Sequence, residues 1–215
     1  MSKVAIQGNA SGTGTFTIAA PNSNTDRTLT LPDEAGTVLT SASSIPVANL
    51  DSAVGITGAD MWRISTDFSP SNSSFQIVPN NWERVDTHGF SKIGTGMTES
   101  SGVFTFPSTG IWKITAHAGF YATSGNAYIS VSIATTVDNG SNWNITAAKY
   151  NNLASGESYQ SPVPTEFIFD VEDTSTHKVS MYVRAAAGNG GAGAIFTGDS
   201  QDSRTSMVFI RLGET

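Results

Sequence analysis

The chain has 215 residues, which is enough for one sizeable domain with an appendage. Charged residues make up 13% of it, against roughly 25% in an average soluble protein. The net charge is −7 at pH 7, and the 11 basic residues are scattered, so nucleic-acid binding is not expected. The absence of cysteine excludes a disulfide framework and a thiolate zinc site.

The N-terminal stretch "MSKVAIQGNASGTG" lacks the apolar core of a signal peptide. No apolar run in the chain approaches the ~20 residues of a membrane span. We therefore expect a soluble protein made in a cytoplasm, without membrane insertion.

Residues 1–40 contain short alternating runs, "TFTIA", "TLTL" and "TVLT", separated by stretches rich in turn residues. This pattern predicts a small β module. It has too few large apolar residues to be stable alone, so it needs a partner surface. Attachment or co-assembly is the role that follows.

Residues 41–60 are predicted to be a linker. Val47, Leu50 and Val54 have helical spacing, but one heptad does not make a coiled coil, which needs about three or four. An ordered linker is the preferred interpretation.

From residue 61 to residue 215 the sequence predicts one strand after another, which favours a jelly roll or another β-sandwich. The predicted strands include "WRIST", "SFQIV", "VFTF", "IWKITAHAGFYA", "AYISVSIATTV", "WNITAAKY", "TEFIFDV", "HKVSMYVRAA" and "TSMVFIRL". The pair Asn139-Gly140 lies between two of these runs and predicts a tight hairpin turn. We therefore expect an all-β chain with a C-terminal jelly-roll head.

Alternate residues in three of these strands are apolar, and we expect them to form the core. They are Trp112, Ile114, Ala116, Ala118 and Phe120, then Ile129, Val131 and Ile133, and finally Val179, Met181 and Val183.

The opposite faces of several strands are also apolar. Ile111 and Tyr121 lie opposite the core set, Phe167 and Phe169 alternate with Ile168, and both faces of "SMVFIRL" are apolar. A strand that is apolar on both faces is covered on both faces, and in a two-layer sandwich a second subunit can supply one of those covers. We expect self-association, with candidate subunit-interface residues Tyr121, Tyr182, Met207 and Phe209.

The stretch "VFTFPSTGIWKITAHAGF" resembles the signature of the complement q-subunit globular head, a jelly roll shared with the tumour necrosis factor superfamily. Phe104 and Gly110 match the signature. Trp112 replaces the usual tyrosine, Ile114 the usual phenylalanine, and Ala116 the final aromatic residue. The ending "FTGDSQDSRTSMVFIRL" looks like the closing strand of that family. The resemblance implies a compact homotrimer and identifies no ligand.

Residues 12–40, with the core "TLTLP" and a following "GT", are similar to a short module near the ends of tail-fibre and other structural proteins of tailed bacteriophages. The resemblance implies an appendage of a virion, in which the N-terminal module contacts other virion proteins and the head contacts the host surface. It also implies a location on the virion after synthesis in the host cytoplasm.

The stretch "GNGGAG", residues 188–193, has the glycine spacing of a dinucleotide-binding loop. The following "AIFTGDSQDS" cannot open the helix whose N-terminus would hold a pyrophosphate. We interpret the stretch as a loop and expect no cofactor. No G-x-S-x-G motif is present and no carboxylate pair stands out, so we expect no enzyme.

Two groups of residues have side chains that could bind a metal ion. His88, His117 and His177 lie far apart without metal-ligand spacing, so they are predicted to be surface or interface histidines. The acidic cluster in "DVEDTSTHK" contains Asp170, Glu172 and Asp173. It could supply oxygen ligands to calcium, but a solvated turn is the better interpretation. No metal site is predicted.

Four aromatic residues lie in or beside polar, turn-rich segments, where aromatic rings stack on sugars or contact protein partners. They are the candidate ligand-contact residues Trp82, Trp143, Tyr150 and Tyr159.

Together these features predict a homotrimeric virion structural protein, a tail fibre or similar appendage. Its head would contact a cell-surface glycan or protein through three copies of a weak site. Two alternatives remain: a capsid decoration or tail protein without a receptor role, and a secreted lectin-like binding module.

Overall fold

The computed structural model of the protein describes residues 11–15, 17, 22–26, 28, 55–71, 73–122, 127–153, 164–187 and 194–215. The chain divides into two units, Met1–Ile45 and Pro46–Thr215. All strands of the described residues lie in the second unit, which is called the head below. Within the described ranges, no helix is long and apolar enough to cross a membrane. Most of the predicted N-terminal module and linker lies outside the described residues.

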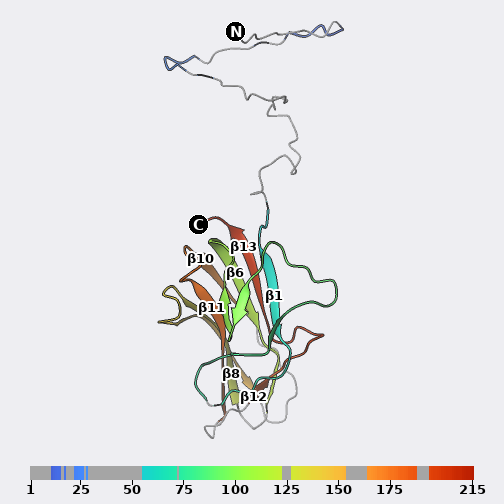
Figure 1. The fold of residues 1–215 in the computed structure, drawn as a ribbon, viewed down its shortest axis with the longest axis vertical. Coiled ribbons are helices and arrows are strands. Elements are labelled where there is room, and N and C mark those ends of the chain that lie inside the picture. Colours follow the sequence, from blue (N-terminus) through green and yellow to red (C-terminus); the bar gives the residue numbers. More distant parts are fainter. Residues whose placement is uncertain are drawn as a thin grey trace. The chain divides into compact units, whose positions relative to one another are not determined.

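The described part of the head is built from strands joined by loops (Figure 1). The strands are β1 (Ala59–Ile64), β2 (Gln76–Ile77), β3 (Trp82–Arg84), β4 (Thr98–Ser100), β5 (Val103–Thr105), β6 (Gly110–His117), β7 (Phe120–Ala122), β8 (Ala127–Thr136), β9 (Asn144–Leu153), β10 (Thr165–Val171), β11 (Lys178–Ala187), β12 (Ala194–Phe196) and β13 (Ser206–Gly213).

Two antiparallel sheets make up the body of the head. Sheet A has the strand order β10-β6-β13-β1-β3, and sheet C has the order β4-β5-β11-β8-β9, with β2 also paired to β11. The chain passes from sheet C to sheet A between β5 and β6, returns at β8, and crosses again at β10, β11 and β13. Repeated crossing between two packed antiparallel sheets is the jelly-roll arrangement. The predicted fold class, an all-β jelly roll, is therefore confirmed.

The first and last strands are neighbours in sheet A, where Ala59 of β1 pairs with Ile210 of β13. They run side by side in Figure 1, and the chain enters β1 at the end of the head where the C-terminus lies. Strand β1 begins at Ala59, inside the range predicted to be a linker.

Strand β6 explains how the sequence builds the core. Its residues are buried and partly buried in strict alternation, as a strand with one face on a core requires. The inward positions predicted from the sequence are all buried: Trp112, Ile114, Ala116, Ala118, Phe120, Ile129, Val131, Ile133, Val179, Met181 and Val183. The period of two was therefore sufficient to find the core side of these strands.

Phe104 joins the two sheets at the centre of the core. It lies on β5 of sheet C and is fully buried. Its ring centroid is 5.7 Å from that of Trp62 on β1, 5.0 Å from that of Trp82 on β3, and 5.1 Å from that of Phe209 on β13. The two tryptophan contacts are edge-to-face, which is a favourable geometry for aromatic pairs. One side chain of sheet C thus contacts three strands of sheet A.

Two of the predicted subunit-interface residues belong to this core. Met207 and Phe209 are fully buried and face sheet C, so no surface remains on them for a second copy. That prediction is wrong for both residues. Both faces of β13 are apolar, so side-chain polarity could not decide which face the core would take.

The Asn139-Gly140 pair lies in the predicted hairpin between β8 and β9, and both residues have positive φ, 56° and 87°. The connection is longer than a two-residue turn, since it covers residues 137–143. His177 also differs from its prediction as a surface or interface residue. It is buried and its ring stacks on Phe169, with centroids 5.5 Å apart.

We expect Phe104→Ala to lower the free energy of unfolding by about 3 to 5 kcal/mol, because it removes a fully buried ring and leaves a cavity between the sheets. Urea denaturation at matched protein concentration measures the change. The control Val137→Ala truncates an exposed side chain in the β8–β9 loop and should stay within about 0.5 kcal/mol of the parent. A loss below about 1 kcal/mol for Phe104→Ala would contradict the central role of this ring.

Candidate functional site

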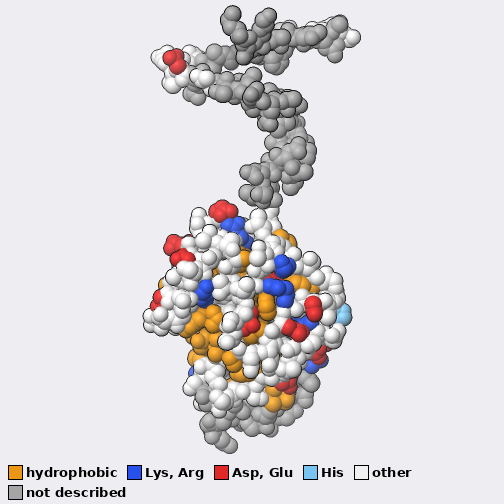
Figure 2. Space-filling view, viewed as in Figure 1, with side chains coloured by type: hydrophobic (Ala, Val, Ile, Leu, Met, Phe, Trp, Pro, Cys, Tyr) orange, Lys and Arg blue, Asp and Glu red, His pale blue; other side chains and the backbone are white. Residues whose placement is uncertain are grey.

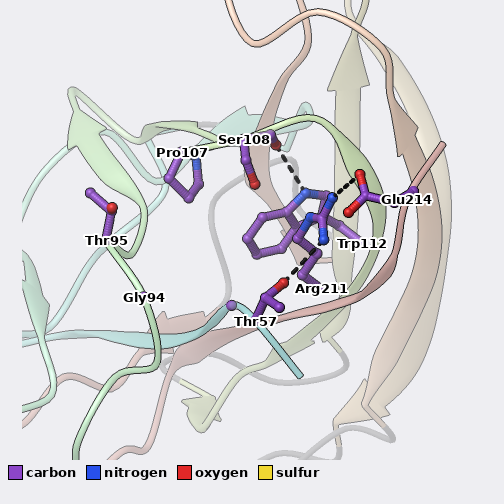
Figure 3. A pocket seen from close by; sticks show the side chains of 9 residues that line it. Thr57, Gly94, Thr95, Pro107, Ser108, Trp112, Arg211 and Glu214 are labelled. Atoms are coloured by element: carbon purple, nitrogen blue, oxygen red, sulfur yellow. Dashed lines mark hydrogen bonds and ion pairs between the residues drawn. The ribbon is translucent and has the colours of Figure 1, made fainter. Parts of the chain in front are cut away.

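A hollow of about 330 Å³ lies at the end of the head where Thr57, just before β1, and Glu214, just after β13, come together (Figure 3). It is lined by Thr57, Gly58, Gly94, Thr95, Pro107, Ser108, Trp112, Arg211 and Glu214. The guanidinium of Arg211 donates to Thr57 Oγ1 at 3.0 Å, to the Thr109 carbonyl at 2.9 Å and to Glu214 Oε2 at 2.7 Å. The pKa of Glu214 is lowered by its hydrogen bond and charge interaction with Arg211. Arg211 therefore connects Thr57, just before β1, and Glu214, just after β13, to the β5–β6 loop.

Gly110 shows why that loop needs glycine. Its φ is 133°, and a Cβ atom there would lie 2.5 Å from the Gly213 carbonyl oxygen and 2.6 Å from Arg211 Nε. Any other residue would displace both groups. The hydrogen-bond donors of Arg211 and Trp112 already have partners within the head. The Trp112 indole N–H donates to the Ser108 carbonyl at 3.2 Å. The polar groups that line the hollow are therefore explained by the contacts that hold Thr57, the β5–β6 loop and Glu214 together.

The outer face of sheet A, turned away from sheet C, carries a row of mostly apolar side chains. Residues paired across strands lie on the same side of a sheet. Ile168 pairs with Lys113, Lys113 with Ile210, Ile210 with Ala59, and Ala59 with Ile93. These five residues form one row across β10, β6, β13 and β1 to the segment beyond, and this is called the outer row below. Ile168 and Ile93 at its two ends are exposed.

The neighbouring register positions continue the apolar surface. Val208 and Met61 pair with each other beside the outer row, and Thr115 pairs with Val208. A single ion pair crosses the strands there, from Lys113 Nζ to Glu166 Oε1 at 3.0 Å. Hydrogen bonding to Lys113 and its charge lower the pKa of Glu166. The face therefore has an apolar centre with one balanced pair of charges.

The part of this face around Arg63 is already covered by the chain itself. Arg63 lies on the outer side of β1 and is 1% exposed. Its guanidinium contacts Glu83 at 2.7 Å and Asp86 at 2.9 Å, and also donates to the carbonyls of Ser200 and Gln201. The segment that follows β12 covers one part of the outer face with polar contacts, while the outer row stays open.

The remaining predicted interface residues belong to other sheets. Tyr121 pairs with Ile195 in sheet B, the small sheet of β7 and β12, and is partly buried. Tyr182 lies on the outer side of sheet C, where burial raises the pKa of its phenol. The sequence pattern identifies only some residues of the outer row, because Ala59 and Ile93 join it through strand pairing that no local pattern indicates.

Two of the four predicted ligand-contact residues share one surface. Trp143 and Tyr150 both lie on the sheet C side of the head, in the β8–β9 loop and on β9. Trp82 instead packs between the sheets against Phe104, and its indole donates to the Val78 carbonyl at 2.8 Å. Its prediction as a ligand-contact residue is wrong, since its ring and N–H group are used inside the head. Tyr159 lies outside the described residues.

Asp138 fixes the loop that carries Trp143. Its Oδ1 accepts hydrogen bonds from Thr136 Oγ1 at 2.6 Å and from the Asn142 backbone N–H at 2.9 Å, and its Oδ2 accepts one from Asn142 Nδ2 at 2.6 Å. The Thr136 and Asn142 hydrogen bonds lower the pKa of Asp138 to about 2. Trp143 then folds back toward Gly140 and packs against Tyr182, with ring centroids 6.1 Å apart.

Among the residues that the structure describes, no group of three or more His, Cys, Asp or Glu side chains could hold a metal ion. Asp170, Glu172 and Asp173 are exposed, and Asp173 Oδ1 accepts from both the backbone N–H and the hydroxyl of Ser175 at 2.7 Å. These local bonds belong to a turn. The stretch "GNGGAG" lies outside the described residues.

Solved structures resemble the chain path of the head. The crystal structure of murine APRIL at pH 8.5 has 11% sequence identity, a TM-score of 0.48, and coverage of 72% of this chain and 98% of that chain. Murine APRIL at pH 5.0 has 13% identity and a TM-score of 0.49 over the same shares. Eiger TNF from S. frugiperda has 12% identity and a TM-score of 0.49, covering 73% and 93%. The strand order of sheets A and C defines the class, a jelly-roll module.

No protein-family model matches the chain, and no curated protein sequence matches it.

The variant Asp138→Asn tests whether the Asp138 carboxylate stabilises the β8–β9 loop in a pH-dependent way. Because the pKa of Asp138 is depressed from 3.8 to about 2 in the folded state, its carboxylate stabilises the fold above pH 3.8, and this stabilisation is lost as pH falls through about 2. We expect the urea midpoint of the parent to exceed that of Asp138→Asn at pH 6, and the difference to disappear near pH 2. A difference that is constant across this pH range would show that the carboxylate charge is not responsible.

Proposed function

We propose that the head is a self-associating, non-enzymatic module that assembles from copies of this chain through the outer face of sheet A. The observation that carries the proposal is the outer row, in which four of five side chains are apolar and which crosses β10, β6, β13 and β1 and leaves Ile168 and Ile93 exposed at its ends. A contiguous apolar sheet face of this kind is typical of a subunit interface. Figure 2 shows that hydrophobic side chains also gather on part of the visible surface of the head, with charged side chains mostly above and to the right.

A ring of three copies is the assembly proposed. The two ends of the outer row differ, since Ile168 lies on the edge strand β10 and Ile93 lies beside β1 at the other side. When one subunit presents the β10 end and its neighbour presents the other end, the contact is heterologous, and such contacts form a ring when the rotation between subunits closes. The resemblance of "VFTFPSTGIWKITAHAGF" to the complement q-subunit head supports the number three.

The finer proposal is that this module is the head of an appendage on a tailed-bacteriophage virion. The similarity of residues 12–40 to a module of phage structural proteins supports it, and in that setting the N-terminal module contacts other virion proteins. Mass spectrometry of purified particles from a phage that carries the gene tests this location directly. Particles without the chain would contradict it.

Ile168→Glu tests the interface. The side chain is 59% exposed in the single head, so the substitution should change the stability of the separate subunit by less than about 0.5 kcal/mol. In the assembly it would bury a second carboxylate beside the Lys113–Glu166 pair, which leaves an excess negative charge in the contact and is costly. We expect the parent to have the mass of a trimer by light scattering and the Ile168→Glu variant to have the mass of a monomer at the same concentration.

Val137→Glu is the matched control, because Val137 is 58% exposed but lies in the β8–β9 loop at the other sheet. It should keep the parental mass. A monomeric parent, or an Ile168→Glu variant with the parental mass, would be evidence against this face as the interface.

A further inference from the structure

The outer face of sheet C gathers aromatic side chains around one arginine. The cross-strand register places Tyr182 and Arg184 of β11, Tyr128 of β8 and Tyr150 of β9 on this side, opposite the core positions Val131 and Val183. Trp143 joins them by packing on Tyr182, and Phe75 joins them through Arg184. This set is called the aromatic face: Phe75, Tyr128, Trp143, Tyr150, Tyr182 and Arg184.

Short side chains separate the large ones. Arg184 pairs with Ser130, which pairs in turn with Tyr150, and Tyr182 pairs with Ser132 in the next outward-facing row. Two strand spacings put the backbones of Arg184 and Tyr150 about 10 Å apart. Because the serines are short, the guanidinium and the phenol ring project beyond them on either side. Ser130 and Ser132 are themselves fully buried, so a sugar ring would lie on top of the guanidinium and the phenol ring and not in a gap between them.

Arg184 is held in place and still has donors to offer. Its guanidinium carbon lies 5.1 Å from the Tyr128 ring centroid and 5.5 Å from that of Phe75, and Nε donates to the Ser73 carbonyl at 2.6 Å. No described residue accepts a hydrogen bond from its two Nη groups. A guanidinium positioned by aromatic rings, with its terminal donors open, is suited to bind a carboxylate.

The aromatic rings also keep polar groups available. Tyr150 is 61% exposed, and within the described part of the chain its hydroxyl and the indole N–H of Trp143 have no hydrogen-bond partner. Rings with an apolar body and an open polar tip can stack on a ligand and hydrogen-bond to it together. This combination matches the two faces and the edge hydroxyls of a pyranose ring.

The charge of this region is opposite to that of the whole chain. Of the charged side chains in strands β8, β9 and β11, Lys178 and Arg184 share the outward register of Tyr182, whereas Lys149 pairs with the core position Val131 and lies on the other side of β9. The loop that carries Trp143 also contains the Asp138 carboxylate. The chain as a whole has a net charge of −7. An anionic ligand is therefore attracted to the guanidinium of Arg184 on this face.

We propose that the aromatic face is a binding site for an oligosaccharide that contains carboxylate-bearing sugars. Arg184 binds the carboxylate, and Tyr150 and Trp143 contact neighbouring sugar rings. The site lies on sheet C and does not depend on assembly through sheet A, although several copies in one assembly would strengthen binding by avidity.

Calorimetric titration of the full chain with oligogalacturonate, and with the same oligomer after complete methyl esterification, tests the proposal. The ester keeps the sugar rings and removes the negative charges. We expect the acidic oligomer to bind and the ester to bind at least about tenfold more weakly, which corresponds to about 1.4 kcal/mol. Binding should also change the fluorescence of Trp143, and Trp143→Phe should abolish that change.

The variants locate the site. Tyr150→Ala changes an exposed side chain and should weaken binding at least about fivefold, and Arg184→Leu should bring the affinities for the acid and the ester within about twofold of each other. Lys92→Ala is the control for the loss of one positive charge, because Lys92 is exposed away from sheet C, and it should bind like the parent. No binding of the acidic oligomer at about 5 mM, equal binding of the ester to the parent, or unchanged binding by Tyr150→Ala would each overturn the proposal.

Discussion

The contact of Phe104 with Trp62, Trp82 and Phe209 is the constraint on which the head depends. It joins a short strand of sheet C to three strands of sheet A, and it fixes which face of each strand points inward. Dense packing of this kind allows few alternative registers, because a slip of one residue would turn every side chain to the opposite face. The chemistry of the two outer faces therefore follows from the packing of the core.

The two outer faces differ in character. The strands of sheet A carry four acidic residues, Asp60, Glu83, Glu166 and Asp170, and four basic ones, Arg63, Arg84, Lys113 and Arg211. Their charges are largely paired, and what remains open is an apolar row. The central strands of sheet C carry only basic charged residues, beside partly buried aromatic rings and the exposed Tyr150. One face is thus suited to copies of the same chain, and the other to a ligand of opposite charge.

The sequence resemblance gains a physical explanation in two of its residues. Phe104 is the ring between the sheets, and Gly110 has a backbone conformation and a close approach to Gly213 and Arg211 that exclude a side chain. Trp112 keeps the size needed at its position and uses its indole N–H to hold the β5–β6 loop. Phe104, Gly110 and Trp112 therefore each have a packing role in the head.

The sequence by itself determined the all-β class, the inward positions of strands β6, β8 and β11, and the hairpin at Asn139-Gly140. Period-two alternation is a local property, and it identifies a core face wherever the two faces differ in polarity. Only the tertiary structure decided that Met207 and Phe209 face inward, since both faces of β13 are apolar. It also decided which distant residues share a surface: Ile93 and Ile168 lie at the two ends of one row on sheet A, and Trp143, Tyr150 and Arg184 lie on the sheet C side of the head. Cross-strand register sets these neighbours, and register depends on contacts between segments far apart in the chain.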